Sequence, residues 1–172
     1  MDNSANIITT RSGGSSYERF PADYQSHMHF LRNYSWYDVL PFSLILWPHT
    51  FSDCERQGSW WRERHHYHSL ALELMLEGEL QYEQNGKKTL VRKGDLYLSH
   101  PGNTIKIHSC GQEYAHQLQL VISGSQVPIL LEGLELRQTF LYPRGYSEQI
   151  GKYMDRIADL LLSRTSAVQS SS

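Results

Sequence analysis

Apolar and other residues alternate along the chain between Leu70 and Glu77. Leucine occupies the even positions of this run, whereas Glu73 and Met75 lie among the odd ones. A period of two is typical of a β-strand, because successive side chains of a strand point to opposite faces. The chain from there to Gly102 is interrupted by dipeptides that favour turns. These are Glu77-Gly78, Asn85-Gly86, Gly94-Asp95 and Pro101-Gly102. The pattern therefore predicts an antiparallel meander.

Shorter runs elsewhere in the chain predict further elements. Additional strands are expected at Phe42–Trp47, Thr104–Ser109 and Tyr114–Ile122. Pro48–Gly58 is polar and predicts a loop. Tyr24, Met28 and Leu31 fall on one helical face, which predicts a short helix after Pro21. With the meander, these strands are enough to close a barrel or a sandwich.

The pattern changes to a helical period near the carboxy terminus. Ser147 can cap a helix that runs to about Ser163. Apolar residues recur there at three- and four-residue spacing, namely Ile150, Tyr153, Met154, Ile157, Leu160 and Leu161. Such a stripe must be buried. It packs either against the barrel of its own chain or against the same helix of a second subunit.

Composition and charge narrow the class of protein. The 172 residues are 40% hydrophobic, which fits one globular domain. Their formal charge of −2 creates no positive electrostatic field that would attract the phosphate backbone of a nucleic acid. Cys54 and Cys110 are too few for a disulfide framework, so we expect a cytoplasmic protein. The longest apolar run is too short to span a membrane, and no membrane association is expected.

Three motifs of the meander resemble those of the cupin β-barrel. They are Leu76-Glu77-Gly78-Glu79, the Asn85-Gly86 turn, and Lys93-Gly94-Asp95-Leu96-Tyr97-Leu98 followed by Pro101-Gly102. More narrowly, the chain from about Pro41 to about Leu162 resembles the amino-terminal sensor domain of AraC-type transcription regulators. The resemblance implies a mainly β fold, a cupin-like antiparallel β-barrel (jelly roll) followed by a carboxy-terminal α-helical segment.

The same resemblance implies an organisation of the chain. Residues 1–37 would form a flexible arm and amino-terminal extension, residues 38–124 the ligand-binding barrel, and residues 125–172 a helical dimerisation segment with the start of a linker. The six-residue apolar stripe would then join two subunits, because AraC-type domains commonly dimerise through a helix at this place. Such regulators carry two helix-turn-helix units in a carboxy-terminal domain. We therefore expect DNA to be bound only through a domain absent from these 172 residues.

Nine histidines raise the question of a metal, and three of them lie in His65-His66-Tyr67-His68. Metal-binding cupins carry three histidines and a glutamate at fixed distances from their glycine turns. In this chain the corresponding positions hold Arg64, His66, Ala71 and Ile105. Only one ligand type remains, and Arg64 would place a permanent positive charge at the site. We expect no metal and no cofactor, with a bulge-shifted set of His66, His68 and Glu73 as the alternative.

The residues of the first meander strand also predict a ligand site. If Ala71 faces the barrel interior, strand parity turns Glu73 the same way, and Arg64 approaches the same cavity. Arginine holds carboxylate or hydroxyl oxygens, glutamate accepts hydroxyl hydrogens, and tryptophan offers a stacking face. The predicted ligand-binding residues are Arg64, His66, Glu73, Trp60, Met75 and Tyr97, with His116, Gln117 and Gln119 as further candidates. The set suits a small polar molecule, and only the resemblance suggests a sugar. The alternative is a self-satisfied Arg64–Glu73 pair in a barrel that binds nothing.

The sequence therefore predicts the effector-binding and dimerisation domain of an AraC-type regulator, acting as a homodimer. No nucleophile with its base and no phosphate-binding loop stands out, so we expect that the chain is not an enzyme. Two alternatives remain open. One is a free-standing metal-dependent cupin enzyme, an isomerase or an oxygenase, and the other is a dimerisation module that senses nothing.

Overall fold

The structure is a computed structural model that describes residues 4–11, 14–36, 45–110, 114–138, 140–142, 145 and 147–169. The strands are β1 Ser4–Arg11, β2 Gly14–Pro21, β3 Met28–Ser35, β4 Trp47–Arg56, β5 Trp61–His65, β6 Leu70–Gln84, β7 Lys87–Arg92, β8 Leu96–Ser99, β9 Ile105–Ser109, β10 Ala115–Ser123 and β11 Leu141–Tyr142. The helices are the single 3-10 turn η1 Tyr24–His27, α1 Val127–Gly133 and α2 Ser147–Gln169. No helix within these ranges is long and apolar enough to cross a membrane.

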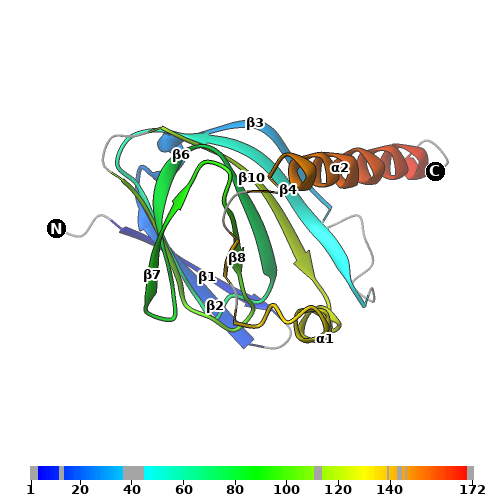
Figure 1. The fold of residues 1–172 in the computed structure, drawn as a ribbon, viewed down its shortest axis with the longest axis horizontal. Helices are drawn as coiled ribbons and strands as arrows, with labels where there is room; N and C mark the ends of the chain where they lie inside the picture. Colours follow the sequence, from blue (N-terminus) through cyan, green and yellow to red (C-terminus); the bar gives the residue numbers. More distant parts are fainter. Residues whose placement is uncertain are drawn as a thin grey trace.

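The eleven strands of the described residues form one sheet in which every pairing is antiparallel. Its order is β1-β2-β5-β9-β6-β10-β4-β3, with β7 and β8 also pairing with β6, and β11 with β8. The sheet curls into a barrel-like shell, and α2 lies on its outside (Figure 1). The predicted fold class, a mainly β chain with a cupin-like antiparallel barrel and a carboxy-terminal helical segment, is confirmed.

Strand β6 is longer than predicted, because the expected turn at Glu77-Gly78 is wrong. The chain passes through this point as a β-bulge, where the pairing with β10 skips Leu76. Before the bulge β6 pairs with β8 and β10, and after it β6 pairs with β7 and β9. Gly78 adopts φ +79°, and a Cβ there would lie 1.9 Å from the carbonyl oxygen of Tyr114. Only glycine therefore allows β6 to serve both halves of the barrel.

Two other predicted elements also require correction. The polar segment Pro48–Gly58 is not a loop, because most of it belongs to β4, which pairs with both β3 and β10. The helix predicted after Pro21 is reduced to the turn η1, since the chain from Met28 pairs with β4 as a strand. The strand predicted at Phe42–Trp47 lies mostly outside the described residues, and β4 begins at its last residue.

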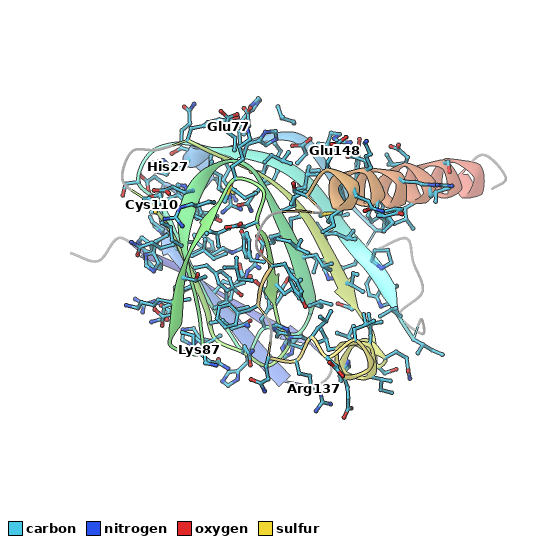
Figure 2. The ribbon with its side chains drawn as sticks, viewed as in Figure 1. His27, Glu77, Lys87, Cys110, Arg137 and Glu148 are labelled. Carbon is cyan, nitrogen blue, oxygen red and sulfur yellow. The ribbon has the colours of Figure 1, made fainter. Side chains whose placement is uncertain are left out.

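Two apolar clusters occupy opposite faces of the strands around β6. The inner one fills part of the barrel, where side chains from both halves of the sheet meet (Figure 2). It includes Tyr24, Trp60, Met75, Leu80, Tyr82, Val91, Tyr97, Ile105, Ile107 and Ala115. The outer one lies between the sheet and the two helices and includes Phe51, Leu70, Leu74, Leu118, Leu120, Val127, Leu131, Met154 and Ala158. Before the bulge, the even leucines of β6 face the helices and its odd residues face the barrel interior, whereas after it the even residues Leu80 and Tyr82 face inward.

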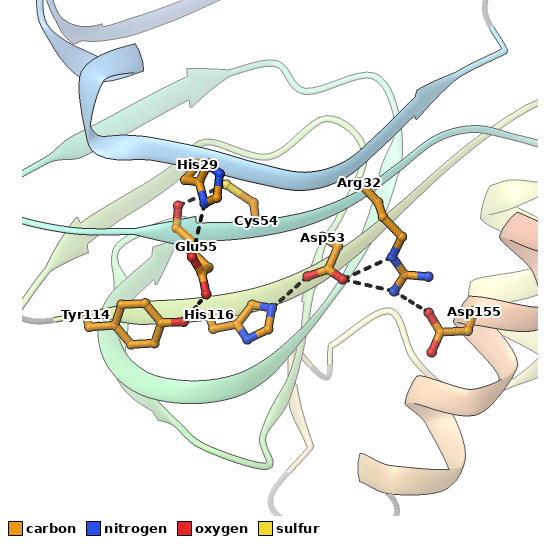
Figure 3. A network of polar contacts seen from close by, with 8 residues as sticks. All are labelled: His29, Arg32, Asp53, Cys54, Glu55, Tyr114, His116 and Asp155. Atoms are coloured by element: carbon orange, nitrogen blue, oxygen red, sulfur yellow. Dashed lines mark hydrogen bonds and ion pairs between the residues drawn. The ribbon is translucent and has the colours of Figure 1, made fainter.

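A network of polar contacts on the outer face of the sheet connects three strands to α2 (Figure 3). His116 Nε2 lies 2.6 Å from Oδ1 of Asp53, and Arg32 donates to Oδ2 of Asp53 from Nε and Nη2 at 3.1 and 2.9 Å. The Nη2 atom of Arg32 also donates to Oδ1 of Asp155 on α2 at 2.6 Å. The helix is therefore held to the barrel by polar contacts as well as by apolar packing.

The amino-terminal segment takes part in the sheet. The backbones of β1 and β2 form a hairpin, and β2 pairs with β5 through Tyr17–His65 and Glu18–Arg64. The sequence predicted no regular structure before about Ser16, since this stretch has no apolar period. The register instead brings Glu18 next to an arginine of the predicted ligand site.

Candidate functional site

A polar cavity of about 300 Å³ lies inside the barrel, between β2 and β5 on one side and β3, β4 and β10 on the other. Its wall includes Arg62 and Arg64 on β5, Ser52 on β4 and Gln119 on β10. The side chains on β4 and β10 come from inward-facing strand positions, which alternate with outward positions that include Phe51, Leu118 and Leu120. A barrel interior that is polar at one end and apolar at the other is a suitable place for a small ligand.

An inward-facing row of polar residues crosses four neighbouring strands beside this cavity. Gln119 is paired with Ser52 on one side and with Glu73 on the other, and Glu73 is paired with Tyr97. The carboxylate of Glu73 is fully buried, which requires hydrogen-bond donors around it. Those donors are the Tyr97 hydroxyl at 2.9 Å, Gln117 Nε2 at 3.1 Å and the Ser99 hydroxyl at 3.3 Å.

Glu18 joins the two arginines of the cavity wall. The Nη2 atom of Arg62 donates to Oε2 of Glu18 at 2.7 Å, and Nε of Arg64 lies 3.0 Å from Oε1. Burial alone would raise the pKa of the Glu18 carboxyl, but the positive charges of Arg64 and Arg62 outweigh it and lower that pKa to about 2. Glu18 is therefore a carboxylate at any physiological pH.

Arg64 is held in place by an aromatic ring as well as by Glu18. Its guanidinium carbon lies 4.7 Å from the centre of the Tyr67 ring, within the range of a cation–π contact. Its side chain is only 5% exposed, and its Nη1 has no hydrogen-bond partner among the described residues. A buried guanidinium N–H without an acceptor is costly, and an incoming oxygen atom would satisfy it.

A third arginine lies deeper in the barrel. Arg56 is 4% exposed, and its guanidinium carbon is 4.5 Å from the centre of the Trp60 ring and 5.9 Å from that of Tyr24. Within the described part of the chain, its Nε and Nη1 have no hydrogen-bond partner. Arg56 is therefore a cation buried against the inner apolar cluster, where aromatic faces contact it.

The structure brings together most of the predicted ligand residues. Arg64 lines the cavity, Glu73 and Tyr97 form the polar row beside it, and Met75 and Trp60 are buried in the adjoining apolar cluster. Trp60 contacts Arg56 and Tyr24. His66 does not join this group, because it lies exposed after β5 with φ +52°.

The further candidates divide by strand parity. Gln117 and Gln119 face the barrel interior, whereas His116 faces outward and contacts Asp53.

Several cavity residues were missed by sequence reasoning. Arg62 is two residues before Arg64 on the same strand, so the parity already used for Glu73 would have placed both inside. Thr50 and Ser52 were hidden because inward polar residues made β4 resemble a loop. Glu18 offered no local signal, since its place depends on the pairing of β2 with β5.

The residues present do not fit the metal site of metal-binding cupins. Arg64, Ala71 and Ile105 occupy three of the four ligand positions, and all are buried. Two of these side chains have no donor atom, and the third is a permanent cation. The alternative set also fails, because His66 is exposed and Glu73 is fully buried. Among the described residues, no three His, Cys, Asp or Glu side chains group as a metal site would require.

Comparison with known proteins finds likeness only at the level of structure. No family model and no curated protein sequence matches the chain. The cupin domain of Cnp3 from Schizosaccharomyces pombe is 11% identical with a TM-score of 0.44, covering 77% of this chain and 96% of that one. The Cupin_2 domain of an XRE family transcriptional regulator from Enterobacter cloacae is 9% identical with a TM-score of 0.41, covering 55% and 92%.

A predicted oxalate decarboxylase from Thermotoga maritima is also similar, with 15% identity, a TM-score of 0.42, and 70% and 92% of the two chains covered. An oxalate oxidase and a salicylate 1,2-dioxygenase are among the similar structures too. The prediction that this chain is not an enzyme is therefore wrong, because enzymes are among the proteins with a similar fold. At these identities the likeness concerns the fold and says nothing of what the cavity holds.

Proposed function

We propose that this chain is the effector-sensing and dimerisation domain of an AraC-type transcription regulator that acts in the cytoplasm. A small polar molecule binds between the two halves of the barrel. Its binding controls a carboxy-terminal helix-turn-helix domain of the kind that such regulators carry. The motif resemblance around Gly78 and Gly94 supports the regulator class, and the cavity supports the binding role.

The observation that carries the proposal is the polar cavity with Arg64 in its wall. A buried arginine with one unpartnered N–H, beside hydroxyl and amide groups on β4 and β10, is costly in a barrel that binds nothing. The interior alternative, an Arg64–Glu73 pair, is not what the contacts support. Arg64 contacts Glu18, and Glu73 is bonded by Tyr97, Gln117 and Ser99.

The position of α2 supports a route from the cavity to the rest of a regulator. On β4, Ser52 faces the cavity and the next residue, Asp53, faces outward to Arg32, which in turn contacts Asp155 on α2. A shift of β4 on ligand binding would therefore be transmitted to α2 through the contacts of Arg32 with Asp53 and Asp155. Such coupling requires that the ligand bind two arrangements of the barrel with different affinity.

The first experiment is a thermal-shift screen of the chain against a broad library of small polar molecules. A ligand that binds only the folded state raises the melting temperature in proportion to RT ln(1 + [L]/Kd). Hits should be lost in Arg64→Gln and retained in Arg137→Gln, whose side chain is exposed and lies outside the cavity wall. If no compound in the library shifts the wild-type melting temperature, the sensing role fails.

The second experiment tests the regulator role directly. The chain is fused to a heterologous DNA-binding domain that represses a reporter only as a dimer. We expect repression that changes when a hit from the screen is added. Repression that is present but unchanged by every hit would leave a dimerisation module and overturn the sensing role.

A further inference from the structure

The wall of the cavity carries more positive than negative charge. Among the described residues that line it, the side chains charged at every physiological pH are Arg62, Arg64 and Glu18. Two guanidiniums therefore face one carboxylate, which leaves one net positive charge on these three side chains. Burying positive charge away from water is costly, and an anion in the cavity would offset that cost.

Two guanidinium nitrogens beside the cavity are buried and are not paired with Glu18. Within the described residues, Nη1 of Arg64 and Nε of Arg62 have no hydrogen-bond acceptor. Both arginines line the cavity, and Arg64 is almost completely buried. Guanidinium groups match the planar geometry of a carboxylate, which they bind with charge-assisted hydrogen bonds. The arginine side of the cavity thus suits a carboxylate.

The opposite side of the cavity is polar but uncharged. Thr50 and Ser52 on β4 and Gln119 on β10 present hydroxyl and amide groups, which both donate and accept hydrogen bonds. Groups of this kind recognise hydroxyls, whereas a purely apolar acid would leave them unpartnered. The ring of Tyr67 adds one aromatic face, of the type that packs against the C–H groups of a sugar ring.

We infer that the cavity binds a small hydroxylated monocarboxylate, in the size range of a sugar acid. This inference rests on the proposed function, because it names the chemistry of the ligand at the same site. The carboxylate is held by Arg64 and Arg62, and the hydroxyls are held by the residues of β4 and β10. A cavity of about 300 Å³ matches one such molecule and excludes larger conjugates.

The test compares acids with neutral sugars of the same shape. Isothermal titration calorimetry is done on the wild-type chain with D-galacturonate against D-galactose, and with D-glucuronate against D-glucose. We expect at least one acid to bind about tenfold or more tightly than its neutral partner, because only the acid reaches both arginines. Sodium chloride at the same concentration controls for ionic strength.

Two variants of opposite sign separate charge from structure. Arg64→Gln should weaken acid binding about tenfold or more, since it removes one of the two guanidiniums that hold the carboxylate. Glu18→Gln should tighten acid binding, because it removes the carboxylate that competes for the same guanidiniums. A merely structural role for this cluster would weaken binding in both. If Arg64→Gln does not fold, Gln119→Glu is the second variant, since it adds a negative charge to the wall with little change in shape.

The outcomes distinguish this inference from the proposed function. Equal binding of acids and neutral sugars overturns the anionic ligand but leaves the sensing role standing. Failure of both acids to bind also overturns it, and the broad library of small polar molecules then decides the sensing role separately. Acid binding that is unchanged in Arg64→Gln, or weakened in Glu18→Gln, contradicts the assignment of the carboxylate to the arginines.

Discussion

Glu18 is the residue whose charge most directly links the amino-terminal hairpin to the barrel. Its folded-state pKa of about 2 is lower than the ordinary 4.5, so the folded chain binds its proton less readily than the unfolded chain. The stabilisation is therefore complete above about pH 4.5 and is lost as the pH falls towards about 2. Because the Glu18 side chain is 24% exposed, we expect its ion pairs to contribute on the order of 2 kcal/mol to the free energy of unfolding.

The measurement is the free energy of unfolding in urea across acidic pH for the wild type and Glu18→Gln. The difference between them should be constant near neutral pH and should shrink in the acidic window. Glu132→Gln, an exposed carboxylate on α1, is the control and should leave the profile unchanged. A wild-type advantage that grows on acidification would contradict the ion pairs with Arg62 and Arg64.

Tyr97 offers a second prediction at the scale of one residue. Its hydroxyl donates to the buried carboxylate of Glu73, so Tyr97→Phe removes a donor without opening a large cavity. We expect a loss of about 1–3 kcal/mol in the free energy of unfolding, because the carboxylate loses a partner that water does not replace. Tyr153→Phe, on the exposed face of α2, should cost less than about 0.5 kcal/mol. Equal effects of the two changes would show that the Glu73 network does not stabilise the fold.

At the scale of elements, β6 shows what a turn signal does and does not predict. Asn85 and Gly86 both adopt positive φ, 49° and 81°, and the hairpin expected there is confirmed. Gly78 has a similar φ of 79°, yet it lies within a strand. The local preference for positive φ is the same in both cases. The two glycines differ in their surroundings. The backbone carbonyl of Tyr114, which is distant in sequence, lies against Gly78 in the bulge, whereas nothing lies within 4 Å of a Cβ at Gly86 in the turn.

This contrast gives a matched pair of substitutions. Gly78→Ala places a Cβ 1.9 Å from a backbone oxygen, an overlap that no side-chain rotation relieves. The Cβ added by Gly86→Ala has no neighbour within 4 Å, so this variant should lose only the free energy that positive φ costs an alanine, about 1–2 kcal/mol. We expect Gly78→Ala to lose at least about 4 kcal/mol of the free energy of unfolding, or to fail to fold. Similar melting temperatures for the two variants would contradict the bulge.

Strand β4 shows why part of the site was beyond sequence reasoning. Parity predicted that Glu73 faces inward if Ala71 does, because the two residues lie on the same face of β6. On β4 the inward residues Thr50 and Ser52 are polar because they line the cavity, so the alternation of polar and apolar positions disappears. A strand that serves a polar site thus loses the pattern by which strands are recognised.

At the scale of the whole molecule, the division into arm, barrel and helical segment stays a prediction. The contacts of the ends show how closely both are tied to the barrel. Glu18 on β2 meets the cavity arginines, and Asp155 on α2 meets Arg32 on β3. Such long-range contacts depend on register and packing, which composition and local pattern do not encode.

The helix α2 gives the last prediction, which concerns assembly. Met154 is 3% exposed and packs on the outer cluster, with Ile150, Ile157 and Leu161 partly buried against it. Tyr153 and Leu160 are 57% and 55% exposed, and their spacing of seven residues places them together on the face turned away from the barrel. The stripe of six residues is therefore divided, with four serving the chain's own core and two available to a second copy.

If two subunits associate through this face, Leu160→Asp should convert a dimer to a monomer with little change in melting temperature, because the side chain contributes little to its own core. Met154→Ala should lower the free energy of unfolding by about 2–4 kcal/mol and leave the dimer intact. Sedimentation velocity and urea unfolding measure the two effects separately. Leu134→Asp, an equally exposed leucine after α1, is the control and should remain dimeric. A wild-type chain that sediments as a monomer at high concentration, or a Leu160→Asp variant that stays dimeric, would rule out α2 as the dimer contact.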